Sequence, residues 1–157
     1  RAGVKRPQRV ARLVLANTAA QLGTPEGWQE RIDTARRHGT ASLAEAVAAR
    51  WFTPEFIASH SERVAKVVAM VRATQPAAYA ACCEAIRDAD QRETLPFVLA
   101  PTLVIAGARD PGTTVEHGEQ LHAQITGSDL LVLDASHMAC IEQAEDFSAA
   151  LLDFLRH

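Results

Sequence analysis

The sequence has little of what would mark a membrane or nucleic-acid-binding protein. It contains no apolar run near the roughly 20 residues that a bilayer-spanning helix requires, so no membrane span is predicted. Its formal net charge is only −3, which gives no electrostatic reason to expect binding to nucleic acid or to an anionic membrane. With 157 residues, 48% hydrophobic and 22% charged, the composition is typical of a globular protein about one ordinary domain in length.

Cysteine is also scarce, and its pattern predicts no disulfide framework or metal site. The chain has an odd number of cysteines, and their spacing is not that of metal ligands: Cys82, Cys83 and Cys140. His117 and His122 are five positions apart, so they do not share a helix face as an i, i+4 pair would. The N-terminal residues show no secretory signal. We therefore expect a reducing, cytoplasmic setting and no bound metal.

An acid and a histidine each follow a short apolar run. Asp110 comes just after residues 102–106 (TLVIA), and His137 just after residues 130–133 (LLVL). A helix-length segment, residues 114–125, separates the two runs, which predicts a parallel strand–helix–strand crossover. Because ligands and chemistry collect at the carboxyl ends of parallel strands, both side chains are expected at the same edge of a sheet.

This pair of residue types suits proton transfer. A histidine gains and loses a proton near neutral pH. A carboxylate that accepts its Nδ1–H fixes the tautomer and stabilises the imidazolium. Asp110 and His137 are therefore the candidate catalytic residues. Asp134, close to His137 in sequence, is the alternative acid.

The chain is predicted to have three parts. Residues 1–20 end in a further buried strand around Leu13-Val14-Leu15. Residues 21–92 form an all-helical block, with helix starts at Thr24-Pro25 and Thr53-Pro54 and a capping box between Ser59 and Glu62. Residues 93–157 return to strand–helix–strand and end in an amphipathic helix, about 144–156.

Several segments resemble a known family. The acid-bearing and histidine-bearing strings, Pro101–Pro111 and Asp134–His137, resemble the corresponding loops of α/β-hydrolases. More specific segments, in and near the helical block, resemble the 3-oxoadipate enol-lactonases: Leu13–Ala20, Gly23–Trp28, Arg50–Pro54 and Tyr79–Asp90. The resemblance runs from about Pro7 to the end. It implies the C-terminal part of an α/β-hydrolase fold, with parallel strands, flanking helices and an inserted all-helical cap.

The same resemblance implies a function. The family opens 3-oxoadipate enol-lactone to 3-oxoadipate in the β-ketoadipate pathway of aromatic degradation, using a Ser-Asp-His triad and no cofactor. Asp110 and His137 match the acid and the histidine. However, the sequence contains no Gly-x-Ser-x-Gly. We therefore expect a longer enzyme whose N-terminal half, in a second chain or in a preceding segment, carries the nucleophilic serine.

The resemblance implies a small lactone-binding pocket under the cap. Trp28, Trp51 and Met138 are the expected wall residues, since flat apolar side chains suit a small planar ring; Trp51 also fits a core position in its helix. The substrate carboxylate calls for a cationic anchor, and the sequence does not choose among Arg31, Arg50, Arg63, Arg72 and Arg87.

Three alternatives remain open at this point. One is another small-ester or lactone hydrolase of the superfamily, because a fold does not fix a substrate. A second is a non-catalytic binding protein of hydrolase-like fold. The third is a self-sufficient domain with an independent function.

Overall fold

The computed structural model describes residues 2–156. The chain separates into two compact units, which are treated individually below. The sheet unit takes in the residues up to Gln21 together with those from Asp90 onward, and the helical unit is Leu22–Ala89. From the sequence, the helical block is predicted to begin after residue 20 and to end at residue 92.

The sheet unit is built on three parallel strands, as the sequence predicted. They are β1 (Leu13–Ala16), β2 (Thr102–Gly107) and β3 (Ser128–Leu133), in the order β1-β2-β3. Every residue of β2 is buried, because this strand lies in the middle of the sheet and is covered on both faces. Within the described residues, β1 pairs with β2 alone, so its other edge is unpaired.

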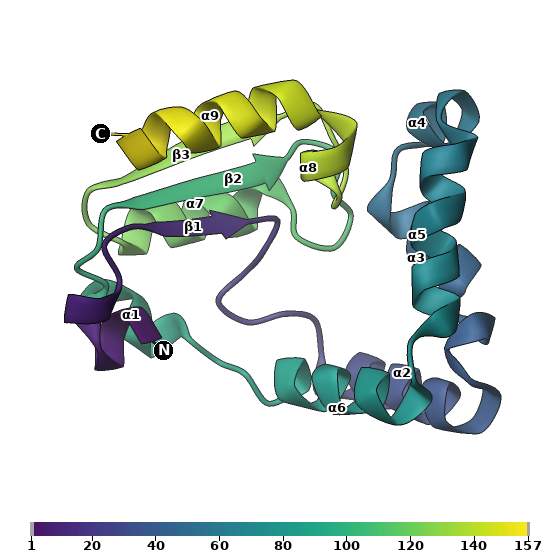
Figure 1. Ribbon diagram of the computed structural model, residues 1–157. Coiled ribbons are helices and arrows are strands. Elements are labelled where there is room, and N and C mark those ends of the chain that lie inside the picture. The colour runs from purple at the N-terminus through teal and green to yellow at the C-terminus, as the bar shows by residue number, and fades with distance from the viewer. Residues whose placement is uncertain (1, 157) are drawn as a thin grey trace. The chain divides into compact units, whose positions relative to one another are not determined.

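Alternate side chains of the strands serve two separate cores. Leu103, Ile105 and Leu133 pack with Phe147 and Phe154 of α9 (Ala144–Arg156) on one face. On the other face, Val104 packs with Leu121 of α7 (Val115–Gln124) and with Ile125 just beyond it. Figure 1 shows α9 and α7 on opposite faces of the sheet. The period-two alternation of a strand thus produces a three-layer arrangement.

Shorter elements complete the sheet unit. Helix α8 (Ala139–Glu142) begins two residues after His137 and leads toward α9. Before the first strand lie α1 (Ala2–Lys5) and the 3₁₀ turn η1 (Pro7–Arg9), and before the second lies η3 (Arg92–Phe97).

Among the described residues of the helical unit, all regular elements are helices. The longest pair is α2 (Pro25–His38) with α6 (Pro76–Arg87), joined by the buried side chains Ile32, Ala80 and Cys83. A second group comprises η2 (Thr40–Ser42), α3 (Ala44–Trp51), α4 (Pro54–Ser59) and α5 (Ser61–Ala73).

Both predicted helix starts are confirmed, but the predicted capping box is wrong. The hydroxyl of Thr24 accepts from the N–H of Gly27 at 3.2 Å, and Thr53 accepts from Phe56 at 3.3 Å. The predicted Ser59 capping box does not form, because Ser59 is the last residue of α4 and its hydroxyl donates back to the carbonyl of Glu55. Local hydrogen bonding within the preceding turn thus satisfies this serine.

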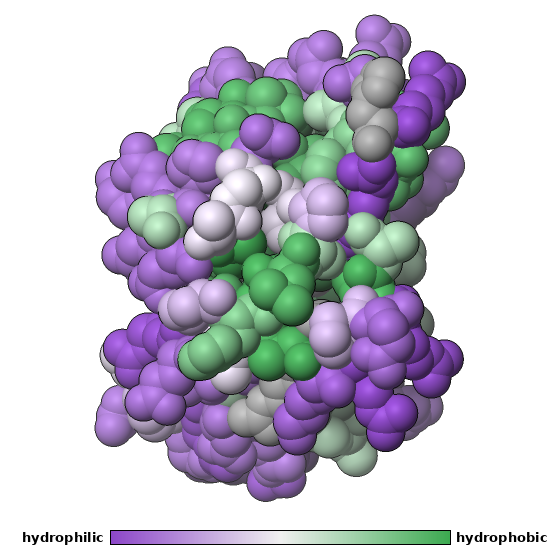
Figure 2. All heavy atoms as spheres, turned by 90° about the vertical axis from the view of Figure 1, so that its left-hand side faces the viewer, coloured by the Kyte–Doolittle hydropathy of each residue, from purple (hydrophilic) through white to green (hydrophobic). Residues whose placement is uncertain are grey.

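Some large hydrophobic side chains remain exposed on the sheet unit. They are Phe97, Leu99, Val132, Leu152 and Leu155. Hydrophobic surface, green among purple, is also visible on the face shown in Figure 2. In the part of the chain that the structure describes, no helix combines the length and the hydropathy needed to cross a membrane.

Gly107, the last residue of β2, lies where two loops meet. A Cβ at this position would come within 2.5 Å of the carbonyl oxygen of Ala135 and 2.6 Å of that of Ser136. These are backbone atoms, so they cannot rotate away as the end of a side chain would. Only glycine permits this approach.

Gly107→Ala is therefore expected to lower the free energy of unfolding by about 1–3 kcal/mol, the usual cost of overpacking. Urea denaturation followed by circular dichroism measures it. Gly27→Ala is the matched control, because its Cβ would meet only Thr24 Oγ1 at 3.4 Å and alanine favours a helix by about 1 kcal/mol over glycine. Wild-type stability in the Gly107 variant would contradict the packing described here.

Candidate active site

The carboxyl ends of all three strands contribute a side chain to one edge of the sheet. Asn17 follows β1, Asp110 lies in the loop after β2, and His137 lies in the loop after β3. Backbone hydrogen bonds connect the two longer loops: the N–H of Ala108 donates to Leu133 O at 2.8 Å, and that of Arg109 to Ala135 O at 3.0 Å. The parallel arrangement thus concentrates polar side chains at the edge where α/β sheets bind ligands.

Asp110 and His137 are joined by a hydrogen bond. His137 Nδ1 lies 2.7 Å from Asp110 Oδ2. The Asp110 side chain is 1% exposed, whereas that of His137 is 31% exposed. A buried carboxylate therefore holds one ring nitrogen of an imidazole that remains partly open to solvent. This arrangement fixes the tautomer that can act as a general base.

Four further hydrogen bonds satisfy the Asp110 carboxylate. The backbone N–H groups of Gly112 and Thr113 donate to Oδ1 at 2.8 and 3.0 Å. The Thr113 hydroxyl and the Asn17 amide donate to Oδ2 at 2.5 and 3.3 Å. Burial by itself raises the pKa of Asp110, but the hydrogen bonds from His137, Thr113 and Gly112 outweigh it and hold that pKa well below its usual range. The group is therefore a carboxylate at neutral pH.

Asp134, the alternative acid, is placed differently. Its side chain is 77% exposed, and its Oδ1 forms an ion pair with Arg109 Nε at 3.2 Å. The geometry favours Asp110 as the partner of His137. The participation of Asp110 and His137 in catalysis stays a prediction.

The three predicted pocket residues fall in different units. Met138 adjoins His137 at the start of α8 and is half-buried. Trp28 packs against the Ile32 cluster of the helical unit, and its indole N–H donates to Leu22 O at 2.7 Å. Trp51 packs against the cluster around Val47, as its helical spacing suggested. Their role as a pocket wall stays a prediction.

The arginines considered as a carboxylate anchor have different surroundings. Arg72 pairs with Glu45 at 2.5 Å, and Arg87 pairs with Asp88 and with the amide oxygen of Gln29. Arg31 contacts neutral aromatic groups: its guanidinium lies 5.7 Å from the centre of the Trp28 ring and 3.3 Å from Tyr79 Oη. Arg50 and Arg63 are exposed. The choice among the five remains open.

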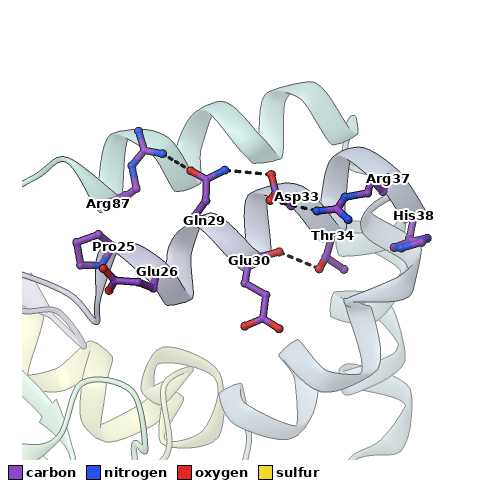
Figure 3. A pocket seen from close by; sticks show the side chains of 9 residues that line it. All are labelled: Pro25, Glu26, Gln29, Glu30, Asp33, Thr34, Arg37, His38 and Arg87. Carbon is purple, nitrogen blue, oxygen red and sulfur yellow. Dashed lines mark hydrogen bonds and ion pairs between the residues drawn. The ribbon is translucent and has the colours of Figure 1, made fainter.

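A polar groove of about 780 Å³ runs along α2 and the end of α6 in the helical unit. Figure 3 shows that its polar groups bond largely to one another: Gln29 bridges Arg87 and Asp33, and Arg37 pairs with Asp33. Neither Asp110 nor His137 lines it. Within residues 2–156, no group of three or more His, Cys, Asp or Glu is placed to hold a metal ion.

Sequence reasoning missed three residues of this site. Thr113 and Gly107 have no distinctive pattern around them, and their roles depend on three-dimensional packing. Asn17 did carry a signal, since it follows a strand in the same way as Asp110 and His137. It was overlooked because an amide does not titrate.

Comparisons with known proteins bear on both sequence and fold. No family model matches the chain. The 3-oxoadipate enol-lactonase 2 of Acinetobacter baylyi is 42% identical over 145 residues, which cover 92% of this chain and 54% of that protein. The crystal structure of the enol-lactonase from Burkholderia xenovorans superposes with a TM-score of 0.97 and 37% identity, covering 99% of this chain and 60% of that one.

The chain is also similar to a more distant solved structure, which is described as an esterase. The structure of a thermophilic esterase from Thermogutta terrifontis gives a TM-score of 0.89 at 28% identity, covering 98% of this chain and 58% of that one. The chain thus spans a little over half the length of each relative.

The depressed pKa of Asp110 predicts how acid affects stability. Since the folded pKa lies below the unfolded one, the contribution of this carboxylate to stability is complete above about pH 5 and is lost as the pH falls toward the folded pKa. Urea unfolding of the wild type and of Asp110→Asn should therefore give a free-energy difference that shrinks between about pH 5 and pH 3. A difference that stays constant over this range would contradict the assignment. Asp134→Asn makes the same substitution at an exposed carboxylate and is the control.

Proposed function

This chain belongs to the α/β-hydrolase superfamily and resembles the C-terminal part of its 3-oxoadipate enol-lactonases. We therefore propose that it supplies the acid and the histidine of a Ser-Asp-His triad. That triad would hydrolyse a carboxylic ester or lactone. The observation that carries the proposal is the 2.7 Å hydrogen bond between buried Asp110 and partly exposed His137. The proposed substrate is 3-oxoadipate enol-lactone, an intermediate of aromatic degradation in the β-ketoadipate pathway.

In the proposed reaction, His137 takes the proton of a serine hydroxyl as the oxygen attacks the lactone carbonyl. Asp110 accepts the Nδ1–H throughout and stabilises the imidazolium. Cleavage of the ring C–O bond leaves an acyl-enzyme and an enolate, which receives the proton from the His137 imidazolium and so becomes a ketone. Water then gives a proton to His137, attacks the acyl group and releases 3-oxoadipate and the free serine.

The serine and most of the oxyanion-stabilising donors would come from polypeptide outside this sequence, which has no Gly-x-Ser-x-Gly. The unpaired edge of β1 suits an added strand, because its N–H and C=O groups are free to extend the sheet. A strand placed there would end beside Asn17, at the same edge as His137. We propose that the polypeptide docked on β1 carries the nucleophile, in a second chain or in a preceding segment. A cytoplasmic location is part of the same proposal.

A second candidate is hydrolysis of simple esters, which the similarity to an esterase favours. Steady-state rates on the enol-lactone and on aryl esters distinguish the two. A preference for the lactone by orders of magnitude in kcat/KM supports the first, and the reverse preference supports the second. A non-catalytic binding protein would turn over neither.

The direct test is treatment of the purified protein with a serine-directed fluorophosphonate, followed by intact mass spectrometry. We expect a polypeptide distinct from, or longer than, this 17.0 kDa sequence to gain one adduct. If the sample contains only this sequence and stays unlabelled, it does not perform triad chemistry, and the proposal fails for that sample.

Replacing the acid separates Asp110 from Asp134. In the labelled, active protein, Asp110→Asn should reduce turnover by about ten-thousandfold, since the amide favours the wrong tautomer of His137. Asp134→Asn should change turnover little, because that carboxylate is exposed and paired with Arg109. Near-normal turnover in the first variant with loss in the second would reverse the assignment.

A further inference from the structure

We propose that Asn17 is a positioning residue for two loops, the acid loop (residues 108–114, after β2) and the histidine loop (residues 134–138, after β3). It holds them at the spacing that the Asp110–His137 hydrogen bond requires. This inference rests on the proposed function for its consequence in catalysis. Its structural content stands on contacts within the sheet unit alone.

Both hydrogens of the Asn17 amide have an acceptor. Nδ2 lies 3.3 Å from Asp110 Oδ2 and 3.3 Å from the carbonyl oxygen of Ser136. A primary amide nitrogen carries two donors, so one side chain ties the carboxylate of the acid to the peptide group immediately before the histidine. The oxygen it reaches on Asp110 is the same one that His137 Nδ1 contacts.

Ser136 is held at its backbone N–H as well as at its carbonyl oxygen. Its N–H donates to the carboxylate of Glu142 on α8, while its C=O accepts from Asn17. Ser136 is 2% exposed. A residue whose N–H and C=O are both fixed by side chains leaves little freedom to the Cα that follows, which is that of His137. The imidazole is therefore oriented from its backbone as well as from its ring.

The backbone at Asn17 is shaped for this contact. Its φ is 45°, and it is the one non-glycine residue with positive φ in the described part of the chain. Asparagine enters this left-handed region more readily than most residues. Its N–H also donates to Ile105 O at 2.8 Å, which fixes the start of the turn beside β2.

Two substitutions separate the backbone role of Asn17 from the role of its amide. Asn17→Gly accepts the positive φ and removes the amide. Asn17→Asp keeps the shape and the backbone preference but replaces both donors with an acceptor, which faces the Asp110 carboxylate and the Ser136 carbonyl. Two carboxylates at this distance repel each other, and the pair then holds a proton to a higher pH than Asp110 does alone.

Gln143→Glu is the matched control. The Gln143 amide also donates to a backbone carbonyl of the histidine loop, that of Asp134, at 3.1 Å. The same amide-to-carboxylate change is thus made at a side chain that contacts the same loop without touching Asp110.

The experiment is proton and ¹⁵N NMR of the purified protein, with any polypeptide that co-purifies, read at the imidazole of His137. In the wild type, Nδ1–H should give a downfield signal and the ¹⁵N shifts of the Nδ1–H tautomer. In Asn17→Asp at neutral pH we expect that downfield signal to be lost. It should return as acid protonates the new carboxyl group and restores a donor toward Asp110. Asn17→Gly should weaken the signal, and Gln143→Glu should leave it unchanged.

Retention of the wild-type signal in Asn17→Asp, with a native circular dichroism spectrum, would overturn the proposal. If Asn17→Asp does not fold, Asn17→Gly provides the test. An unchanged His137 signal in Asn17→Gly would also refute the proposal. In the active enzyme, Asn17→Gly should lower kcat by about a hundredfold with KM little changed, since small misplacements of a catalytic group have effects of this order. If the wild type hydrolyses nothing, the proposed function fails, but the NMR result still decides the role of Asn17.

Discussion

The close approach of two backbone segments at Gly107 sets the geometry of the candidate site. The last residue of β2 lies under the carbonyl groups of Ala135 and Ser136, with no room for a Cβ. From there the chain continues to Asp110, and from the opposing segment it continues to His137. The distance between acid and histidine is therefore established mainly by the main chain, where parallel strands end together, and the side chains refine it.

The second constraint is electrostatic. A carboxylate that is almost fully removed from water is costly unless donors surround it. Asp110 has donors from the turn that follows it, from the Thr113 hydroxyl, from Asn17 and from the imidazole. The same donors that make burial tolerable also order the loop, so the stability of the turn and the orientation of the histidine have a common origin.

Sequence patterns were informative where local chemistry decides the outcome. Three apolar runs predicted three parallel strands, and Thr24-Pro25 and Thr53-Pro54 predicted two helix starts, all of which the structure contains. Ser59 misled because a serine near a helix end can bond forward as a cap or backward to the preceding turn, and the spacing to Glu62 does not distinguish these. The approach at Gly107 is to Ala135 and Ser136, 28 and 29 positions later in the chain. The two contacts of Asn17 join residues 93 and 119 positions apart. No local pattern records either.

The bare edge of β1 has a consequence for handling the molecule in solution. Leu13–Ala16 is apolar and contains neither proline nor charge, and Arg12 is the one charged residue within positions 10–20. Its guanidinium lies over the Phe154 ring at 5.4 Å from the ring centre, so this charge is engaged by α9. An uncovered strand of this composition pairs readily with a second copy of itself. Aggregation that grows with protein concentration is therefore built into the sheet unit whenever nothing covers β1.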